Sequence, residues 1–278
     1  MPECKVCFRH CELKEGQTGF CGARICRDGK VVAKNYGRLS CIGFDPIEKK
    51  PLHRFHPGAM ILSVSSCGCN LRCPFCQNSG ISWSREAMFS VDRLRYVSPE
   101  ELAGCLPEYA SRGNIGVAFT YNEPLVGYEY VRDTAKLVKA RGLKNVVVTN
   151  GTAELSVLEE IAPYIDAFNI DLKSFSADTY RDTLGGDLQT VLNFITEAHK
   201  TAHVELTSLI VTGMNDTEQE MRELSSWVAS LDRNIVLHVS RFFPRFKMTD
   251  RPATDVRLVY RLADIAGEKL NYVVTGNC

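Results

Sequence analysis

The chain has 278 residues, enough for one large domain or for a domain with a small appendage. Its 33 basic and 33 acidic residues give a formal charge of zero, which argues against binding nucleic acid through phosphate neutralisation alone. No segment is apolar over the length that a membrane span needs, and the opening sequence MPECKVCFRH does not resemble a secretory signal. We therefore expect a cytoplasmic protein without a membrane partner.

The twelve cysteines are gathered toward the N-terminus, since ten precede residue 77 and only Cys105 and Cys278 lie beyond it. A fold held by disulfide bonds would distribute its cysteines along the chain. In a chain without an export signal, this gathering indicates metal or redox chemistry in a reducing compartment. Cys105 falls within an expected helix and is most simply a core residue.

Residues 1–57 are predicted to form a small, loop-rich module. They contain several glycines and too few apolar residues for a core of their own, and modules of this kind usually need a metal. Four cysteines could supply a closed set of thiolates to zinc or to an iron–sulfur centre: Cys4, Cys7, Cys11 and Cys21. Cys26 could replace one of them, and a reduced module without metal is the remaining alternative.

From residue 58 to residue 278, segments with the pattern of strands alternate with segments that have the pattern of helices. Strands are expected at 59–66, 115–121, 144–150, 165–172, 203–211, 234–240 and 271–276. Helices are expected at 98–112, 125–142, 154–162, 187–201, 217–231 and 253–269. Six βα repeats and a last strand predict an α/β fold with a parallel sheet covered by helices, either an open sheet or a barrel.

The loop SSCGCNLRCPFCQN, residues 65–78, follows the first expected strand and contains the spacing C-x3-C-x2-C at Cys69, Cys73 and Cys76. A structural zinc site needs a fourth ligand, whereas three thiolates suit a 4Fe–4S cluster with one iron left open. Parallel α/β folds place their active sites at this end of the strands. Cys67 falls outside the spacing and is interpreted as a bystander thiol.

This spacing, with Phe75 before the last cysteine, resembles the signature of the radical S-adenosylmethionine (radical SAM) superfamily. The N-terminal segments CKVCFRHCELKEGQTGFCGAR and DPIEKKPLHRFHPG, together with motifs at successive strand ends, resemble the glycyl-radical-enzyme activating enzymes. They look closer still to the radical SAM enzyme of the AmmeMemoRadiSam system. The strand-end motifs are FTYNEP (119–124), VVTNGT (147–152), NIDLKSF (169–175), LIVTGMND (209–216) and LHVSRFFP (237–244).

The resemblance implies a partial (β/α)6 TIM-like barrel and a 4Fe–4S cluster whose open iron binds the amino and carboxylate groups of S-adenosylmethionine. It implies reductive cleavage to methionine and a 5′-deoxyadenosyl radical, with flavodoxin or ferredoxin as the electron donor. The implied substrate is a protein or peptide, such as a glycine α-carbon. Modification of a small molecule or RNA is the alternative, and a non-catalytic zinc-binding scaffold is a third interpretation.

The resemblance also implies residues that contact S-adenosylmethionine. Glu123 would accept hydrogen bonds from its amino group. Asp171 and Lys173 alternate on one expected strand and could hold the ribose hydroxyls and the carboxylate, although a structural ion pair is the alternative. His238 would reach the adenosyl end. Further contacts are expected from Phe75, Gln77, Tyr121, Asn122, Thr149, Asn150 and Val211.

Two positions qualify these expectations. The main chain of LIVTG is expected to lie along the adenine, with Gly213 permitting the turn that follows. Activating enzymes carry an aspartate before TNG that helps to bind a monovalent cation, and here that position is Val148. We therefore expect the S-adenosylmethionine site without that cation site.

Overall fold

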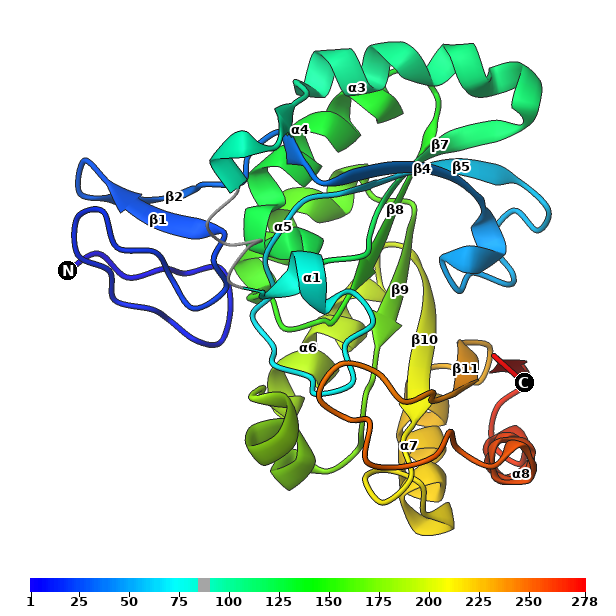
Figure 1. Ribbon diagram of the computed structural model, residues 1–278. Coiled ribbons are helices and arrows are strands. Elements are labelled where there is room, and N and C mark those ends of the chain that lie inside the picture. The colour runs from blue at the N-terminus through cyan, green and yellow to red at the C-terminus, as the bar shows by residue number, and fades with distance from the viewer. Residues whose placement is uncertain (85–90) are drawn as a thin grey trace.

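Eight strands form one curved sheet in the computed structural model of the chain, which describes residues 1–84 and 91–278 (Figure 1). Their order across the sheet is β12-β11-β10-β9-β8-β7-β5-β4, and every neighbouring pair is parallel except β4 with β5. The strands are β4 (Cys41–Pro46), β5 (Met60–Ser65), β7 (Asn114–Phe119), β8 (Lys144–Thr149), β9 (Ala167–Asp171), β10 (His203–Ile210), β11 (Val236–Arg241) and β12 (Val273–Gly276).

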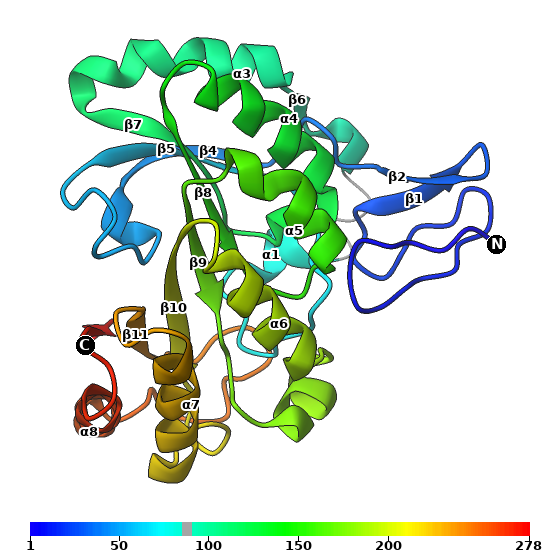
Figure 2. The same ribbon diagram turned by 180° about the vertical axis from the view of Figure 1, so that it is seen from behind.

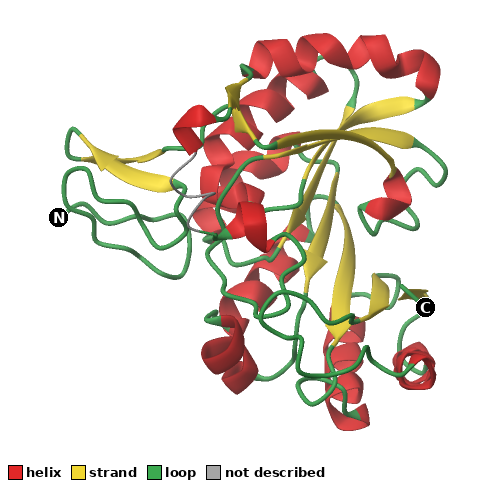
Figure 3. Cartoon of the chain, viewed as in Figure 1, coloured by secondary structure: helices red, strands yellow, loops and turns green. Residues whose placement is uncertain are grey.

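The helices that connect the parallel strands lie together on one face of this sheet, as Figures 2 and 3 show. They are α3 (Pro99–Cys105), α4 (Tyr128–Lys139), α5 (Leu155–Ile161), α6 (Leu188–Ala198), α7 (Glu218–Leu231) and α8 (Val256–Gly267). The predicted (β/α)6 arrangement is thereby confirmed. The sheet stays open, because β4 and β12 form its two ends and do not pair with each other.

Local sequence signals explain where several helices begin. The predicted capping box at the start of α3 is present: Ser98 accepts from the N–H of Glu101, whose carboxylate accepts from the N–H of Ser98. After Cys105 the predicted helix tightens into a 3-10 turn over residues 106–112, with Pro107 in its first turn. The predicted helix at 98–112 is therefore two shorter helical pieces.

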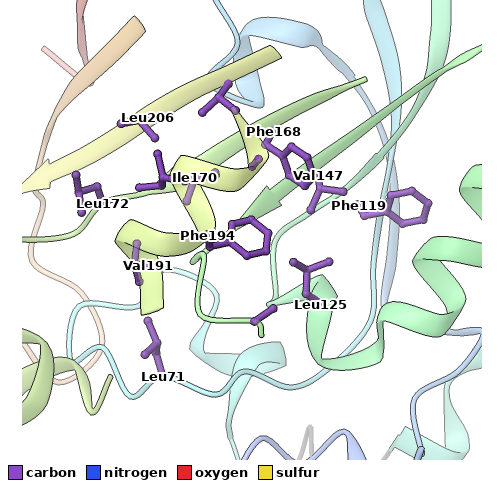
Figure 4. Packing of buried hydrophobic residues seen from close by; sticks show 14 of the residues in the cluster. Leu71, Phe119, Leu125, Val147, Phe168, Ile170, Leu172, Val191, Phe194 and Leu206 are labelled. Atoms are coloured by element: carbon purple, nitrogen blue, oxygen red, sulfur yellow. The ribbon is translucent and has the colours of Figure 1, made fainter. Parts of the chain in front are cut away.

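The main core lies between the sheet and its helices. In Figure 4, Phe168 and Ile170 of β9 lie near Val191 and Phe194 of α6, and the rings of Phe168 and Phe194 meet edge to face with centroids 5.9 Å apart. These side chains are fully buried. Burial of each such side chain stabilises the fold by about 1.5–3 kcal/mol.

The N-terminal region contributes to two parts of the molecule. Residues 1–40 contain irregular loops and a small antiparallel pair, β1 (Arg24–Arg27) and β2 (Lys30–Ala33), on the opposite side of the molecule from the C-terminus (Figures 1 and 2). β4, in contrast, is an edge strand of the main sheet. The boundary expected after residue 57 stays a prediction, but the residues before it do not all belong to one separate module.

The segment between β4 and β5 packs on the sheet face opposite the helices. Ile47 and Leu52 are fully buried there against Ile61, Ala118 and Val146. β3 (Arg38–Leu39) and β6 (Arg95–Tyr96) form a further short antiparallel pair. Within the described residues, no helix is long and apolar enough to cross a membrane.

Candidate functional site

The loop after β5 carries the three cysteines of the predicted cluster site. The Leu71 N–H and the Asn150 side-chain amide both donate to the Cys69 sulfur, at 3.4 Å and 3.7 Å. The N–H of Cys76 donates to the carbonyl of Cys73 at 3.2 Å, which closes a turn between these two cysteines. All twelve cysteines are free thiols. Donors directed at a sulfur stabilise its thiolate form, so this set of groups fits an iron–sulfur cluster.

Burial controls the acidity of these thiols. It raises the pKa of Cys69 well above its usual range, with Glu123 adding to the increase, and it raises the pKa of Cys73 to about 11. A metal must therefore displace protons to bind here. Cys67, which we interpreted as a bystander, lies in a separate apolar cluster with Val91, and burial raises its pKa to about 11.

Glu123 is buried, not an exposed residue at a helix start, because only 4% of it is accessible. Its Oε1 accepts from the Thr149 hydroxyl at 2.7 Å and from the Leu125 N–H at 3.0 Å, and its Oε2 accepts from the Asn150 N–H at 2.7 Å. Burial outweighs these bonds and raises its pKa to about 7. A carboxylate offers about four acceptor positions, so one remains for an N–H of a ligand amino group.

Asp171 and Lys173 lie together at the end of β9, where the Lys173 Nζ is 2.8 Å from the Asp171 Oδ2. Burial lowers the pKa of Lys173, but Asp171 and the Cys73 thiolate outweigh burial and raise it above its usual range. The pair therefore places a cation beside the cluster loop. The geometry is compatible with both expectations for this pair, ligand binding and a structural ion pair.

Asn150 joins the cluster loop to the loop after β8. Its side chain donates to the Asn70 Oδ1 at 2.9 Å and accepts from the Thr152 N–H and hydroxyl at 3.1 Å and 2.6 Å. Asn70 in turn donates to the Thr152 hydroxyl at 2.7 Å. Sequence reasoning missed Asn70 and Thr152, although both lie inside motifs that it used.

His238 uses one ring nitrogen to bind a buried carboxylate, since its Nε2 lies 2.6 Å from the Glu205 Oε2. Glu205 is inaccessible and also binds the His203 ring at 2.9 Å and the main-chain N–H groups of His53 and Arg54, both at 2.8 Å. Burial opposes ionisation, but the two histidines and the N–H groups lower the pKa of Glu205 to about 2. Sequence reasoning missed Glu205, whose only signal is a charged residue inside an apolar strand. The contact of His238 with the adenosyl group stays a prediction.

Tyr121 has a left-handed backbone with φ of 71°. Its hydroxyl donates to the Asp45 Oδ2 at 2.5 Å and lies 3.2 Å from the Nζ of Lys50, which is 1% accessible. Burial lowers the pKa of Lys50. Sequence reasoning expected Tyr121 in the site but missed its contacts with Lys50 and Asp45, which lie 71 and 76 residues earlier in the chain.

The remaining expected contacts lie at the start of the cluster loop, at the surface or in the core. The Asn122 amide accepts from the Ser66 N–H at 3.0 Å and donates to the Gly68 carbonyl at 3.1 Å, so it fixes the start of the cluster loop. Gln77 is exposed. Phe75 and Val211 are buried in the core. The Val211 N–H donates to the Asn215 side chain at 2.8 Å, and the Val211 carbonyl accepts from the N–H groups of Met214 and Asn215, so its contact with adenosine stays a prediction. The turn at Gly213 has the expected left-handed backbone, with φ of 78°.

The four cysteines expected to bind a second metal line a single pocket. Its other lining residues include Arg9, Arg24 and Asn70; the cysteines are Cys4, Cys7, Cys11 and Cys21. Cys26 does not line the pocket, and its sulfur instead lies 3.6 Å from a carboxylate oxygen of Glu15. The alternative in which Cys26 replaces one ligand therefore finds no support in this arrangement.

Comparison with known proteins identifies the family. The sequence profile of the Radical SAM superfamily matches residues 63–228. An uncharacterized protein of Methanocaldococcus jannaschii is 39% identical over 280 residues, covering 99% of this chain and 80% of the relative. The pyruvate formate-lyase-activating enzyme of Clostridium pasteurianum is 25% identical over 202 residues, covering 71% of this chain and 80% of that enzyme.

Solved structures agree in fold. A domain of the pyruvate-formate lyase-activating enzyme from Bacteroides vulgatus has a TM-score of 0.51 at 20% identity, over 58% of this chain and 98% of that chain. SuiB of Streptococcus suis, bound to S-adenosylmethionine, has a TM-score of 0.59 at 15% identity, over 76% of this chain and 48% of that chain. The relation to activating enzymes is confirmed, and the closer relation to the AmmeMemoRadiSam enzyme stays a prediction. Because the profile covers more than half of the chain, the protein belongs to the radical SAM superfamily and is an enzyme of that type, which implies a 4Fe–4S cluster and S-adenosylmethionine.

Proposed function

We propose that Cys69, Cys73 and Cys76 hold a 4Fe–4S cluster with one iron left open for S-adenosylmethionine. The observation that carries this proposal is the three-thiol loop at the end of β5, with two N–H donors directed at the Cys69 sulfur. When bound, the cluster and S-adenosylmethionine supply a 5′-deoxyadenosyl radical, with methionine as co-product, that takes a hydrogen atom from the substrate.

The surrounding side chains would orient the bound S-adenosylmethionine. Glu123 has one acceptor position left for an N–H of the ligand's amino group, while Thr149 and Asn150 hold the Glu123 carboxylate in place. Lys173 would bind the ligand carboxylate, which would free Asp171 to accept from the ribose hydroxyls. Val211 and His238 would contact the adenosine. Phe75, Gln77, Tyr121 and Asn122 would shape the walls of the site.

We propose a protein or peptide as the substrate, by analogy with the pyruvate formate-lyase-activating enzymes among the relatives. A structure of SuiB bound to the precursor peptide SuiA has the same fold. Modification of a small molecule or RNA is the alternative. Incubation with a candidate glycyl radical enzyme separates the two, because only an activating enzyme produces the glycyl radical signal in electron paramagnetic resonance (EPR) spectra.

The electron donor that we propose is a low-potential flavodoxin or ferredoxin of the cytoplasm. We also propose that the N-terminal cysteines bind a second metal centre, either zinc or an iron–sulfur cluster. Their shared pocket supports this proposal; the cysteines are Cys4, Cys7, Cys11 and Cys21.

The test of the catalytic site is a SAM-cleavage assay after anaerobic reconstitution. Wild type is expected to produce 5′-deoxyadenosine with a low-potential reductant, whereas the triple variant C69A/C73A/C76A is expected to produce none and to bind about four fewer irons per chain. Cys67→Ala is the matched control, because Cys67 lies in the same loop outside the spacing and should retain both properties. Cleavage by the triple variant, or its loss in the Cys67 variant, would contradict the assignment.

A further inference from the structure

The N-terminal cysteine pocket contains four thiols and a buried hydrogen-bond donor without a partner in the described part of the chain, which indicates a ligand site. Arg24 lines the pocket with only 5% of its surface accessible, and its buried Nε has no hydrogen-bond partner among the described residues. Its other guanidinium nitrogens bind Glu129 and the Val31 carbonyl. A buried donor without a partner costs about 1–3 kcal/mol, and a thiolate-bound centre in this pocket would satisfy it. The pocket thus combines four thiols with a donor that lacks an acceptor.

Four thiols in one pocket suit either a zinc ion or an iron–sulfur cluster. The position of this pocket beside the loop of Cys69 favours the cluster, because a redox-active centre there could exchange electrons with the catalytic cluster.

Cationic and amide groups in the pocket suit a negatively charged cluster. Arg9, Arg24 and Asn70 line the pocket together with the four thiols. Four thiolates bound to iron and sulfide carry a net negative charge, which nearby arginines and N–H donors stabilise.

This pocket directly adjoins the cluster loop, which carries Cys69, Cys73 and Cys76. The Cys69 N–H donates to the Cys21 carbonyl at 3.2 Å, and Gly68 approaches so closely that an added Cβ would lie 2.7 Å from the same carbonyl. The Arg9 Nε donates to the Asn70 carbonyl at 2.7 Å. Asn70 therefore lines the cysteine pocket while its neighbour Cys69 belongs to the catalytic set.

We propose that Cys4, Cys7, Cys11 and Cys21 hold an iron–sulfur cluster that passes single electrons to the catalytic cluster. The role rests on the proposed function, whereas the binding of the cluster does not. In each transfer the N-terminal cluster is oxidised by one electron and the catalytic cluster is reduced by one, with no bond or proton exchanged. A low-potential flavodoxin or ferredoxin then returns one electron to the N-terminal cluster.

The first experiment measures iron, sulfide and zinc after anaerobic reconstitution of C69A/C73A/C76A, which lacks the catalytic ligands. We expect about four irons and four sulfides per chain, and an EPR signal on reduction, both lost when Cys7→Ser is added. Cys26→Ala in the same background is the matched control and should keep them, because Cys26 lies in the same region outside the pocket. One zinc per chain, or no metal, would overturn the proposal even if wild type cleaves S-adenosylmethionine.

The second experiment tests the electron transfer. In Cys7→Ser alone, we expect the catalytic iron to remain and cleavage driven by titanium(III) citrate, a small reductant, to persist, while cleavage driven by reduced flavodoxin falls at least about tenfold. Wild type, fully reduced, should show an EPR spectrum broadened by interaction between two neighbouring paramagnetic clusters, and the variant should not. Equal flavodoxin-driven rates in both proteins, with no broadening in wild type, would contradict the relay.

Discussion

Glu123, which we propose accepts from the amino group of S-adenosylmethionine, carries a buried carboxyl group with a pKa of about 7. The N–H of that amino group binds the charged carboxylate much more strongly than the protonated acid. We therefore expect the affinity for S-adenosylmethionine to fall by up to about tenfold for each pH unit below 7, and to level off above it. Anaerobic calorimetry of the reconstituted protein from pH 6 to pH 8.5 measures this.

In Glu123→Gln, the affinity at pH 8 should be about tenfold to a hundredfold weaker, because one charge-assisted hydrogen bond is lost. Its pH dependence in this range should disappear. Glu100→Gln, at an exposed position in α3, is the control and should behave like wild type. A pH dependence that survives in Glu123→Gln would assign it to another group.

The low pKa of Glu205 is expected to make the fold sensitive to acid. Its pKa of about 2 in the folded protein lies below the ordinary value of 4.5, so its contribution to stability is full above about pH 4.5 and is lost as the pH falls toward 2. Glu205→Gln should lower the unfolding free energy at pH 7 by about 3 kcal/mol, because donors from His203 and His238 lose their acceptor.

Urea unfolding of the metal-free protein at several pH values measures both effects. The difference in unfolding free energy between wild type and Glu205→Gln should shrink as the pH falls from 4.5 toward 2. A difference that stays constant over this range would mean that the carboxylate charge is not what stabilises the two histidines and the segment at His53 and Arg54.

At the scale of elements, a glycine allows the loop that carries Cys69, Cys73 and Cys76 to lie close against the N-terminal region. Gly68 has φ of 102°. A Cβ at this position would lie 2.7 Å from the Cys21 carbonyl oxygen and 2.9 Å from the Cβ of Ala23. Gly68→Ala should therefore lower the unfolding free energy by about 2–4 kcal/mol and reduce the iron bound on reconstitution. Thermal unfolding and iron analysis measure these outcomes.

Gly80→Ala is the matched control, because Gly80 lies in α1 (Ser79–Ser82), where an added Cβ meets no atom within 4 Å. It should change the midpoint of thermal unfolding and the iron content little. If Gly68→Ala behaved in the same way, the close contact between the loop and the N-terminal region would not contribute to cluster binding.

The spacing of apolar residues predicted the parallel strands and their helices, because that spacing depends on which faces of a strand or helix are buried. β4 escaped prediction, since CIGFDP is partly exposed and its pairing with β5 depends on tertiary contacts. The same limit applies to the site. Glu123 and Lys173 lie in recognisable motifs, whereas Glu205 meets the N–H of His53, and Lys50 meets Tyr121, only when distant segments come together.

At the scale of the molecule, the residues before the expected boundary at 57 supply an edge strand of the main sheet and cover part of one of its faces. Residues 58–278 alone would lack β4 and would expose Ile61, Ala118 and Val146, which Ile47 and Leu52 now cover. We expect this fragment to bind the hydrophobic dye ANS and to lose cooperative unfolding, in contrast to the full chain. A cooperative transition with a native-like circular dichroism spectrum would instead show that 58–278 is an independent domain.

The surroundings of the N-terminal cysteines have a consequence for biosynthesis. The Glu154 N–H donates to the Val6 carbonyl, Arg24 pairs with Glu129, and Arg9 bonds to the carbonyl of Gly185. A ribosome makes the cysteines first and these partners more than a hundred residues later, so the nascent chain carries exposed thiols without their pocket. If these cysteines bind the proposed metal centre, its insertion follows translation of most of the chain, and the cell must keep the thiols reduced until then.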